Sequence, residues 1–150
     1  MKVLFVCTGN TCRSPMAEGI LKSIAKEKGL DIDVDSVGIS AYDGSQASPN
    51  SIEAMKKIKI DISKHKASQL HRDLVDESDL ILTLSQSHKE FILSNYPQAK
   101  DKLFTLLKYA YGEEKDVADP FGRNLAYYER TRDEIYEAIM QFKILRRDKQ

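Results

Sequence analysis

A cysteine and an arginine stand six positions apart, between a short apolar run and a Ser-Pro pair typical of a helix start. These residues are Cys7 and Arg13, and the segment between them contains Gly9 and Asn10. Both Gly9 and Asn10 tolerate the left-handed backbone conformation that lets successive N–H groups point at one centre. The guanidinium of Arg13 matches two oxygens of a phosphate group. The pattern predicts a cradle for a phosphate dianion, with the thiol of Cys7 at its base.

The surroundings of this loop favour an ionised thiol. A helix that begins near Pro15, after the capping residue Ser14, points the positive end of its dipole at the loop. We expect the pKa of Cys7 to lie below the ~8.5 of a free thiol, because only the thiolate matches the charge of the cradle. A thiolate beneath a bound phosphoryl group is placed for in-line attack. The chain has no G-x-x-x-x-G-K-[ST] motif, which argues against a nucleotide-binding phosphate loop.

The residues in and beyond this loop resemble a known family. Residues 7–18 read Cys-Thr-Gly-Asn-Thr-Cys-Arg-Ser-Pro-Met-Ala-Glu, which is similar to the signature of the low-molecular-weight protein tyrosine phosphatases. Three later segments also resemble the family, so the match spans nearly the whole chain. They are Asp35-Ser36, residues 61–70 and Asp119-Pro120.

This resemblance implies roles for individual residues. Cys7 would be the nucleophile that forms a phosphocysteine intermediate, Arg13 the phosphate clamp, and Asp119 the general acid and then the base. The rest of the phosphate-binding loop would be Thr8, Gly9, Asn10, Thr11, Cys12 and Ser14. A hydrogen-bond network that fixes the loop and stabilises the thiolate would consist of Asn10, Ser14, Ser36 and His65. Phosphoryl transfer needs positioning and charge neutralisation, which Arg13 and the loop supply, so neither a metal ion nor another cofactor is expected.

Two positions favour phosphoarginine over phosphotyrosine as the substrate. Thr11 stands where the tyrosine enzymes usually carry an apolar residue such as Ile, and Asp119-Pro120 is followed by Phe121-Gly122 rather than by two aromatic residues. Both features resemble the bacterial protein arginine phosphatase branch. The Thr11 hydroxyl can meet the guanidinium or its attacking water, Phe121 can stack on the guanidinium plane, and Asp119 can protonate the departing nitrogen. We expect a phosphatase for protein phosphoarginine, with protein phosphotyrosine as the alternative substrate.

Other functions account for fewer of these residues. A thioredoxin-coupled arsenate reductase has a similar loop but needs a further resolving cysteine, and this chain has only Cys7 and Cys12. A phosphotransferase-system carrier domain would leave Arg13 and Asp119 unexplained. A non-catalytic phosphoprotein-binding module would need neither Cys7 nor Asp119.

Cys12 has two interpretations, which the sequence leaves open. It is either a small buried residue of the loop or the partner of Cys7 in a reversible disulfide that protects the nucleophile from overoxidation. The cysteines and histidines do not have the spacing of a metal site. We expect His71 and His88 to lie at the surface.

The apolar pattern predicts strands that alternate with helices. Strands are indicated at residues 3–6, 32–39, 80–84 and 103–107. Helices are indicated at residues 15–28, 50–58, 85–96 and 125–147, with a short helix or turn at 70–77 and a long loop at 109–123. This order is typical of an α/β fold with a short parallel sheet of about four strands and helices on both faces. Ligands bind at the carboxyl ends of such strands, where Cys7 follows the first one.

Composition limits the class of protein further. The chain has 150 residues with 23 basic and 23 acidic side chains, so it has the size of one domain and a formal net charge of 0. A protein that coats nucleic acid or acidic lipid usually has a basic excess, so neither partner is expected. The two cysteines, and the lack of a ~20-residue apolar run or a signal peptide, favour the cytoplasm. We expect one phosphatase domain over residues 1–150, a monomer that acts on phosphorylated proteins.

Overall fold

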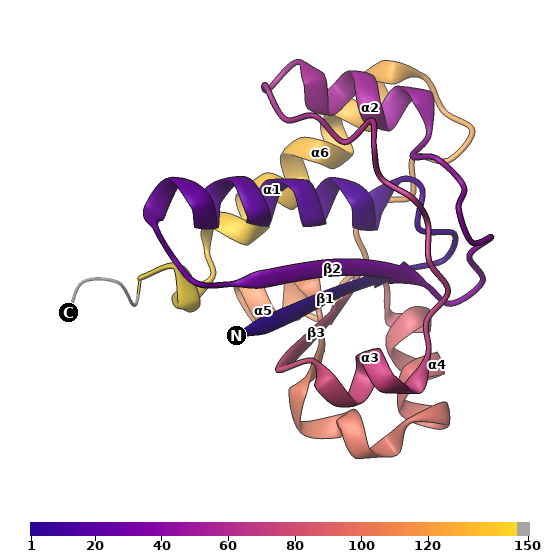
Figure 1. Ribbon diagram of the computed structural model, residues 1–150, viewed down its shortest axis with the longest axis vertical. Helices are drawn as coiled ribbons and strands as arrows, with labels where there is room; N and C mark the ends of the chain where they lie inside the picture. The colour runs from indigo at the N-terminus through magenta and orange to yellow at the C-terminus, as the bar shows by residue number, and fades with distance from the viewer. Residues whose placement is uncertain (147–150) are drawn as a thin grey trace.

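Four parallel strands form the sheet of the computed structural model, which describes residues 1–146 (Figure 1). They are β1 (Lys2–Cys7), β2 (Asp33–Gly38), β3 (Leu80–Thr83) and β4 (Leu103–Thr105). Their order across the sheet is β2-β1-β3-β4, and every pair is parallel. The predicted short parallel sheet is confirmed, and β1 lies inside it with a neighbour on each side.

Helices cover both faces of this sheet, as predicted. On one side lie α1 (Arg13–Lys28), α2 (Pro49–Lys56), α5 (Leu106–Tyr111) and α6 (Leu125–Met140). On the other side lie α3 (Arg72–Glu77), α4 (Gln86–Asn95) and the 3₁₀ helix η1 (Pro97–Lys102). Phe5 of β1 packs into the first layer, whereas Leu4 and Val6 pack into the second. Because β1 is buried on both faces, its sequence is continuously apolar instead of alternating.

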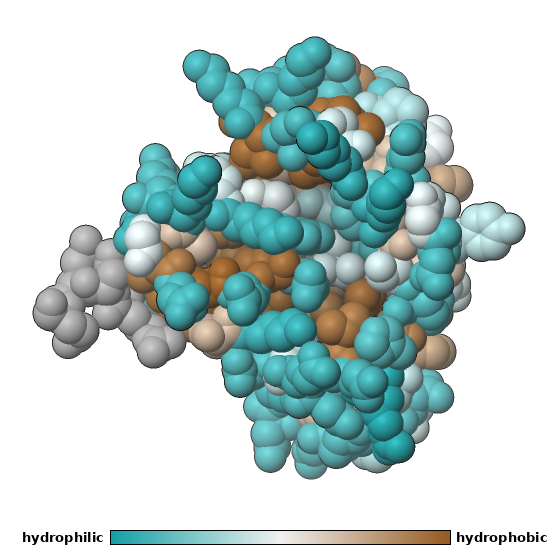
Figure 2. All heavy atoms as spheres, viewed as in Figure 1, coloured by the Kyte–Doolittle hydropathy of each residue, from teal (hydrophilic) through white to brown (hydrophobic). Residues whose placement is uncertain are grey.

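The surface of the helices is mostly hydrophilic. On the face drawn in Figure 2, charged and polar side chains lie over α1 and α3, and apolar atoms are exposed between these two helices, along the edge of the sheet, and again between α1 and α2. Among residues 1–146, no helix combines the length and the apolar character that crossing a bilayer requires.

Helix α1 begins two residues earlier than the capping pattern predicted. Arg13 is its first residue and Cys12 its N-cap, so Ser14 lies inside the first turn and does not cap the helix. The Ser14 hydroxyl contacts Cys7 and Asn10 instead. The predicted end is correct, because Gly29 closes the helix in the left-handed conformation with a φ of 68°.

The segment that contains β4 and α5 differs more from the prediction. Residues 103–107 were expected to form one strand, but β4 ends at Thr105 and α5 begins at Leu106. The Thr105 hydroxyl accepts a hydrogen bond from the Lys108 N–H at 3.2 Å, which caps the new helix. The loop expected to start at residue 109 therefore starts after Tyr111.

The last helix is shorter than predicted. Helix α6 ends at Met140, and a short 3₁₀ helix, η2 (Lys143–Arg146), follows it. The Phe142 N–H donates to the Ile139 carbonyl three residues back, which tightens the turn. The Phe142 ring then packs edge-on against the Tyr109 ring, with the ring centres 4.9 Å apart. The helix was expected to end at residue 147, which lies outside the described residues. The part of the charged run 146–149 that follows Arg146 lies outside them too.

Candidate active site

The loop between β1 and α1 joins Cys7, the last residue of the strand, to Arg13, the first residue of the helix. Asn10 takes the left-handed conformation with a φ of 58°. Gly9 does not, so only one of the two residues expected to be left-handed has that geometry. The fully buried Asn10 is therefore the turning point of the loop.

The carboxyl end of β2 closes against this loop. The Ser40 N–H donates to the Thr8 carbonyl at 2.9 Å. A side chain at Gly38 would collide with that carbonyl and lie 3.0 Å from the Asn10 nitrogen. The absence of a side chain at Gly38 thus lets the strand and the loop approach closely.

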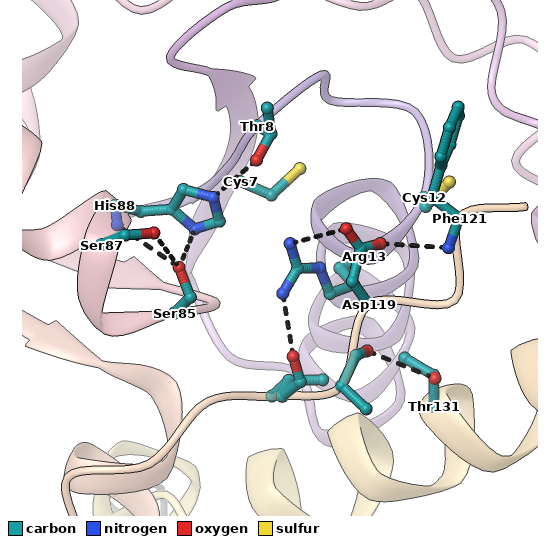
Figure 3. A network of polar contacts seen from close by, with 12 residues as sticks. Cys7, Thr8, Cys12, Arg13, Ser85, Ser87, His88, Asp119, Phe121 and Thr131 are labelled. Atoms are coloured by element: carbon teal, nitrogen blue, oxygen red, sulfur yellow. Dashed lines mark hydrogen bonds and ion pairs between the residues drawn. The ribbon is translucent and has the colours of Figure 1, made fainter.

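One pocket of about 290 Å³ gathers the predicted catalytic residues at the carboxyl end of β1 (Figure 3). Its lining residues come from the loop and from the segment before α6: Cys7, Thr8, Gly9, Thr11, Cys12, Arg13, Asp119 and Phe121. A larger hollow of about 780 Å³ lies between α1 and α6 and contains none of the predicted site residues. Within the described residues, the structure therefore brings the nucleophile, the clamp and the acid together.

Cys7 is buried, and its Sγ lies 2.8 Å from the Ser14 hydroxyl. Burial is the largest influence on this thiol and raises its pKa above the ordinary value. Hydrogen bonding with Ser14, the charge of Arg13 and the backbone of Asn10 act in the opposite direction and lower the pKa. The net direction is upward, so the expectation of a lowered pKa is wrong for this geometry, because desolvation outweighs the donors around the thiol.

Asn10 holds the centre of the predicted hydrogen-bond network. Its Nδ2 donates to the Ser14 hydroxyl at 2.8 Å and to the Ser36 hydroxyl at 2.9 Å. The His65 Nε2 donates to the Asn10 carbonyl at 2.9 Å. All four residues predicted for the network are thus in contact through Asn10.

Two residues that the prediction did not include complete this network. The Ser68 N–H donates to Asn10 Oδ1 at 2.9 Å, and Glu18 accepts from the Ser36 hydroxyl at 2.6 Å. Glu18 lies in α1, one turn after Ser14. Glu18 is the last residue of the segment 7–18 that resembles the family signature, which was a usable signal, whereas the Ser68 contact is made by backbone and has no signature in the sequence.

Arg13 and Asp119 form an ion pair across the pocket. Arg13 Nη2 lies 3.5 Å from Asp119 Oδ2, and Nη1 donates to the Val117 carbonyl at 2.8 Å (Figure 3). Arg13 is buried, while Asp119 is half exposed. The Phe121 N–H donates to Asp119 Oδ1 at 3.1 Å, which fixes the carboxylate in a turn. The clamp and the carboxylate are therefore oriented by different backbone groups of one segment.

His88 is the functional-site residue that the sequence interpretation misplaced. It was expected at the surface, but it is 2% exposed. Its Nε2 lies 2.8 Å from the Thr8 hydroxyl and its Nδ1 lies 2.9 Å from the Ser85 hydroxyl (Figure 3). Burial and then the charge of Arg13 lower its pKa from 6.5 to about 4. A neutral imidazole from α4 therefore supports the loop.

Thr11 and Cys12 complete the wall of the pocket. Thr11 is half-buried, with its hydroxyl 3.8 Å from the Cys12 sulfur. Cys12 is buried, and its sulfur contacts the Tyr128 hydroxyl at 3.5 Å and the Ser48 hydroxyl at 3.6 Å. Both cysteines are free thiols, so Cys12 is a buried loop residue here, and the disulfide stays a prediction.

No cluster of three or more His, Cys, Asp or Glu side chains suited to a metal ion occurs within residues 1–146. The positive charge in the pocket comes instead from Arg13, and the hydrogen-bond donors come from the loop and from α1. This arrangement can hold a phosphate dianion above a thiol and beside a carboxylate.

Comparison with known proteins supplies the family. A family model described as low molecular weight phosphotyrosine protein phosphatase matches residues 2–150. The chain therefore belongs to the low molecular weight phosphotyrosine protein phosphatase family, which confirms the resemblance seen in residues 7–18.

Individual relatives fall in two groups. The protein-arginine-phosphatase of Bacillus subtilis (strain 168) is 43% identical over 150 residues, with 99% of each chain covered. The low molecular weight protein-tyrosine-phosphatase PtpB of Staphylococcus epidermidis is 38% identical over 143 residues, with 95% of this chain and 97% of the relative covered. Among solved structures, a C7S mutant of YwlE arginine phosphatase with a phosphorylated active site serine matches with a TM-score of 0.94 and 42% identity, over 99% of this chain and 98% of that one.

Proposed function

We propose that the protein is a cysteine-dependent phosphatase that removes phosphoryl groups from phosphoarginine side chains of proteins. The observation that carries this proposal is the convergence of Cys7, Arg13 and Asp119 on one pocket whose wall includes Thr11. The full-length similarity to a protein-arginine-phosphatase supports both the reaction and the substrate class. The phosphorylated active site serine in the YwlE mutant supports a covalent phosphoenzyme intermediate.

In the first step, the phosphoryl dianion of the substrate binds in the loop and competes with Asp119 for the guanidinium of Arg13. Cys7 passes its thiol proton to the Asp119 carboxylate, which the dianion has displaced from Arg13, and the resulting thiolate attacks phosphorus in line with the leaving group. The phosphorus–nitrogen bond breaks, and Asp119 donates a proton to the departing guanidino nitrogen. The products of this step are an arginine side chain and a phosphocysteine at position 7.

In the second step, Asp119 acts as a base. It removes a proton from a water molecule that attacks the phosphocysteine, and the phosphorus–sulfur bond breaks. Inorganic phosphate leaves, and Cys7 returns to the thiolate that Ser14 and Arg13 stabilise. The same carboxylate therefore serves both halves of the reaction, as its exposed position beside the pocket allows.

Thr11 is the residue that we assign to substrate choice. It lines the pocket and lies between the nucleophile and the clamp in the loop, so in the proposed complex it would border the atom bonded to phosphorus. A guanidinium has only hydrogen-bond donors, so an acceptor such as the Thr11 hydroxyl matches it and an aliphatic side chain does not. Phosphotyrosine instead favours an apolar side chain at this position, because its aryl ring packs better against an apolar group.

A comparison of two peptides of identical sequence, one with phosphoarginine and one with phosphotyrosine, tests this proposal. The wild-type protein is expected to favour phosphoarginine in kcat/KM, and Thr11→Ile to lower that value about tenfold while raising the value for phosphotyrosine. Thr11→Ser keeps the hydroxyl and serves as the matched control, with its preference for phosphoarginine retained. If Thr11→Ile lowered both values equally, Thr11 would be structural, and phosphotyrosine would become the better-supported substrate.

A further inference from the structure

Two arginines share one tyrosine ring in the segment that follows the pocket residues Asp119 and Phe121. The guanidinium carbon of Arg123 lies 4.9 Å from the centre of the Tyr127 ring, and that of Arg130 lies 5.0 Å from the same centre. Both arginines are exposed, and Tyr127 is half-buried. Because each guanidinium lies over the ring, both positive charges are held at the same side chain and keep few of their free rotamers.

Two links along the chain connect this cluster to the pocket. Arg123 follows the pocket residue Phe121 by two positions, and its N–H donates to the Pro120 carbonyl at 2.9 Å, which closes a tight turn. Tyr127 is adjacent in sequence to Tyr128, whose hydroxyl lies 3.5 Å from the pocket residue Cys12. The cluster therefore begins two residues after the pocket lining, at a turn that a backbone hydrogen bond closes.

Other basic residues near this surface already have carboxylate partners. Lys57 pairs with Glu129 at 2.6 Å, and Arg132 pairs with Asp133 at 2.8 Å. Within residues 1–146, neither Arg123 nor Arg130 forms an ion pair with a carboxylate. Two guanidinium groups that lack a carboxylate partner favour the binding of an anion to either of them.

We propose that Arg123, Tyr127 and Arg130 form a subsite for an acidic side chain, Asp or Glu, of the phosphoprotein substrate. Arg123 lies two residues after the pocket residue Phe121, and an extended chain advances about 3.3 Å per residue, so the acidic residue would lie within about three residues of the phosphorylated one. A carboxylate fits this cluster because the planar fork of a guanidinium pairs with its two oxygens. The subsite rests on the proposed phosphatase function and adds a preference for the sequence around the phosphorylated residue.

The test uses two synthetic phosphoarginine peptides that differ only in carrying glutamates or glutamines on both sides of the phosphorylated residue. The wild-type protein should have a lower KM for the acidic peptide. Each of the substitutions Arg123→Gln and Arg130→Gln should raise that KM about threefold, and the double variant about tenfold, with kcat retained. The KM for the neutral peptide and the turnover of a small aryl phosphate should not change.

Two controls separate a subsite from a general effect of charge or folding. The double variant Lys143→Gln/Arg146→Gln removes the same charge from η2, which follows the end of α6 remote from Arg123, and should leave both KM values unchanged. Tyr127→Phe keeps the ring and should behave like wild type, whereas Tyr127→Leu should raise the KM for the acidic peptide alone. Added salt should remove the preference for the acidic peptide from the wild-type protein.

Binding to Cys7→Ala variants, measured by fluorescence anisotropy of the labelled acidic peptide, gives a result that does not depend on turnover. Weaker binding after loss of Arg123 and Arg130, with unchanged binding of the neutral peptide, supports the subsite. Three results overturn it. One is equal binding of both peptides by the parent and the double variant, and another is an equal loss of affinity for both peptides in the double variant. The third is tighter binding of a single-stranded oligonucleotide than of the acidic peptide. Failure of the phosphatase proposal would appear separately, as absent turnover of the aryl phosphate and both peptides by the wild-type protein.

Discussion

The ionisation of Cys7 depends on a balance between burial and a few hydrogen-bond donors. Burial raises the pKa of the thiol, and the Ser14 hydroxyl, the Arg13 charge and the Asn10 backbone oppose that rise. Ser14 makes the largest opposing contribution and is itself held by Asn10 Nδ2 at 2.8 Å. The network around Asn10 therefore acts on the chemistry by aiming one hydroxyl at the sulfur.

The substitution Ser14→Ala removes this hydroxyl and should raise the pKa of Cys7 further. Hydrogen bonds to charged groups contribute about 1.5–3 kcal/mol, so kcat/KM at neutral pH should fall at least about tenfold. The rate of alkylation of Cys7 by iodoacetamide, followed against pH, should shift to higher pH. The exposed Ser23 of the same helix supplies the control, because Ser23→Ala leaves the thiol untouched. An alkylation profile identical to wild type would show that Ser14 does not stabilise the thiolate.

At the scale of single residues, the reactive groups could be predicted from the sequence, but the surroundings that bury them could not. Cys7 and Arg13 are recognisable because a strand, a fixed spacing and a Ser-Pro pair place them in one loop. The burial of His88 follows from contacts with Thr8, which is 80 positions away in the chain, and no local pattern reports such a distance. The pKa of Cys7 was misjudged for the same reason, since desolvation depends on the whole fold and not on the loop alone.

Among the elements, α4 has a direct link to the phosphate-binding loop. His88 lies in the first turn of α4, and its ring connects the Ser85 cap of that helix to the Thr8 hydroxyl. The ring fits this position only while it is neutral, because burial and Arg13 lower its pKa to about 4. The attachment of α4 to the loop is therefore sensitive to acid.

Stability should consequently decrease as the pH falls from about 6.5 to about 4, the interval between the ordinary and the lowered pKa of His88. In that interval the unfolded chain binds a proton that the folded chain does not, and the loss reaches up to about 3 kcal/mol. Urea unfolding at several pH values should show a shallower decline for His88→Gln than for wild type. The exposed His71 gives the control His71→Gln, which should decline as wild type does. Parallel curves for all three proteins would contradict a neutral, buried His88.

The elements themselves were predictable in type where their patterns are long. The apolar run of β1 indicates a strand and the spacing of apolar residues in α1 indicates a helix. Both elements are found within two residues of the expected bounds. Residues 103–107 are too short to show a period, so Leu106 and Leu107 fit a buried strand and a buried helix equally well. The Thr105 hydroxyl caps a helix that begins at Leu106, and the two leucines are therefore helical. Likewise, α6 stops before its apolar pattern does, because Phe142 must turn to reach Tyr109.

The order of strands explains why the pocket lies where it does. The chain leaves β1 to one neighbour, β2, and later reaches the other neighbour, β3. Connections that diverge in this way open a crevice at the carboxyl end of the central strand, which is where ligands bind in open α/β sheets. The loop after β1 occupies that crevice with the end of β2 against one side and His88 of α4 on the other. The site is thus a consequence of the topology as much as of the loop.

This arrangement predicts that a methyl group at the end of β2 disturbs phosphate binding. In Gly38→Ala the new Cβ would collide with the Thr8 carbonyl and crowd the Asn10 nitrogen, so the loop must shift. Overpacking of this kind costs about 1–3 kcal/mol of stability. Inorganic phosphate raises the Tm of a protein that binds it in the folded state, and this rise should be much smaller in Gly38→Ala than in wild type.

The matched control is Gly9→Ala, which places a methyl group inside the loop itself, where its nearest neighbour outside the adjacent residues is the Thr11 hydroxyl at 3.8 Å. If space decides the outcome, the change at Gly9 should reduce the phosphate-induced rise in Tm less than the change at Gly38. The comparison is made by thermal unfolding of the three proteins with and without phosphate, together with kcat/KM on an aryl phosphate. A larger loss at Gly9 than at Gly38 would mean that the conformational freedom of the loop, and not the close approach of β2, controls binding.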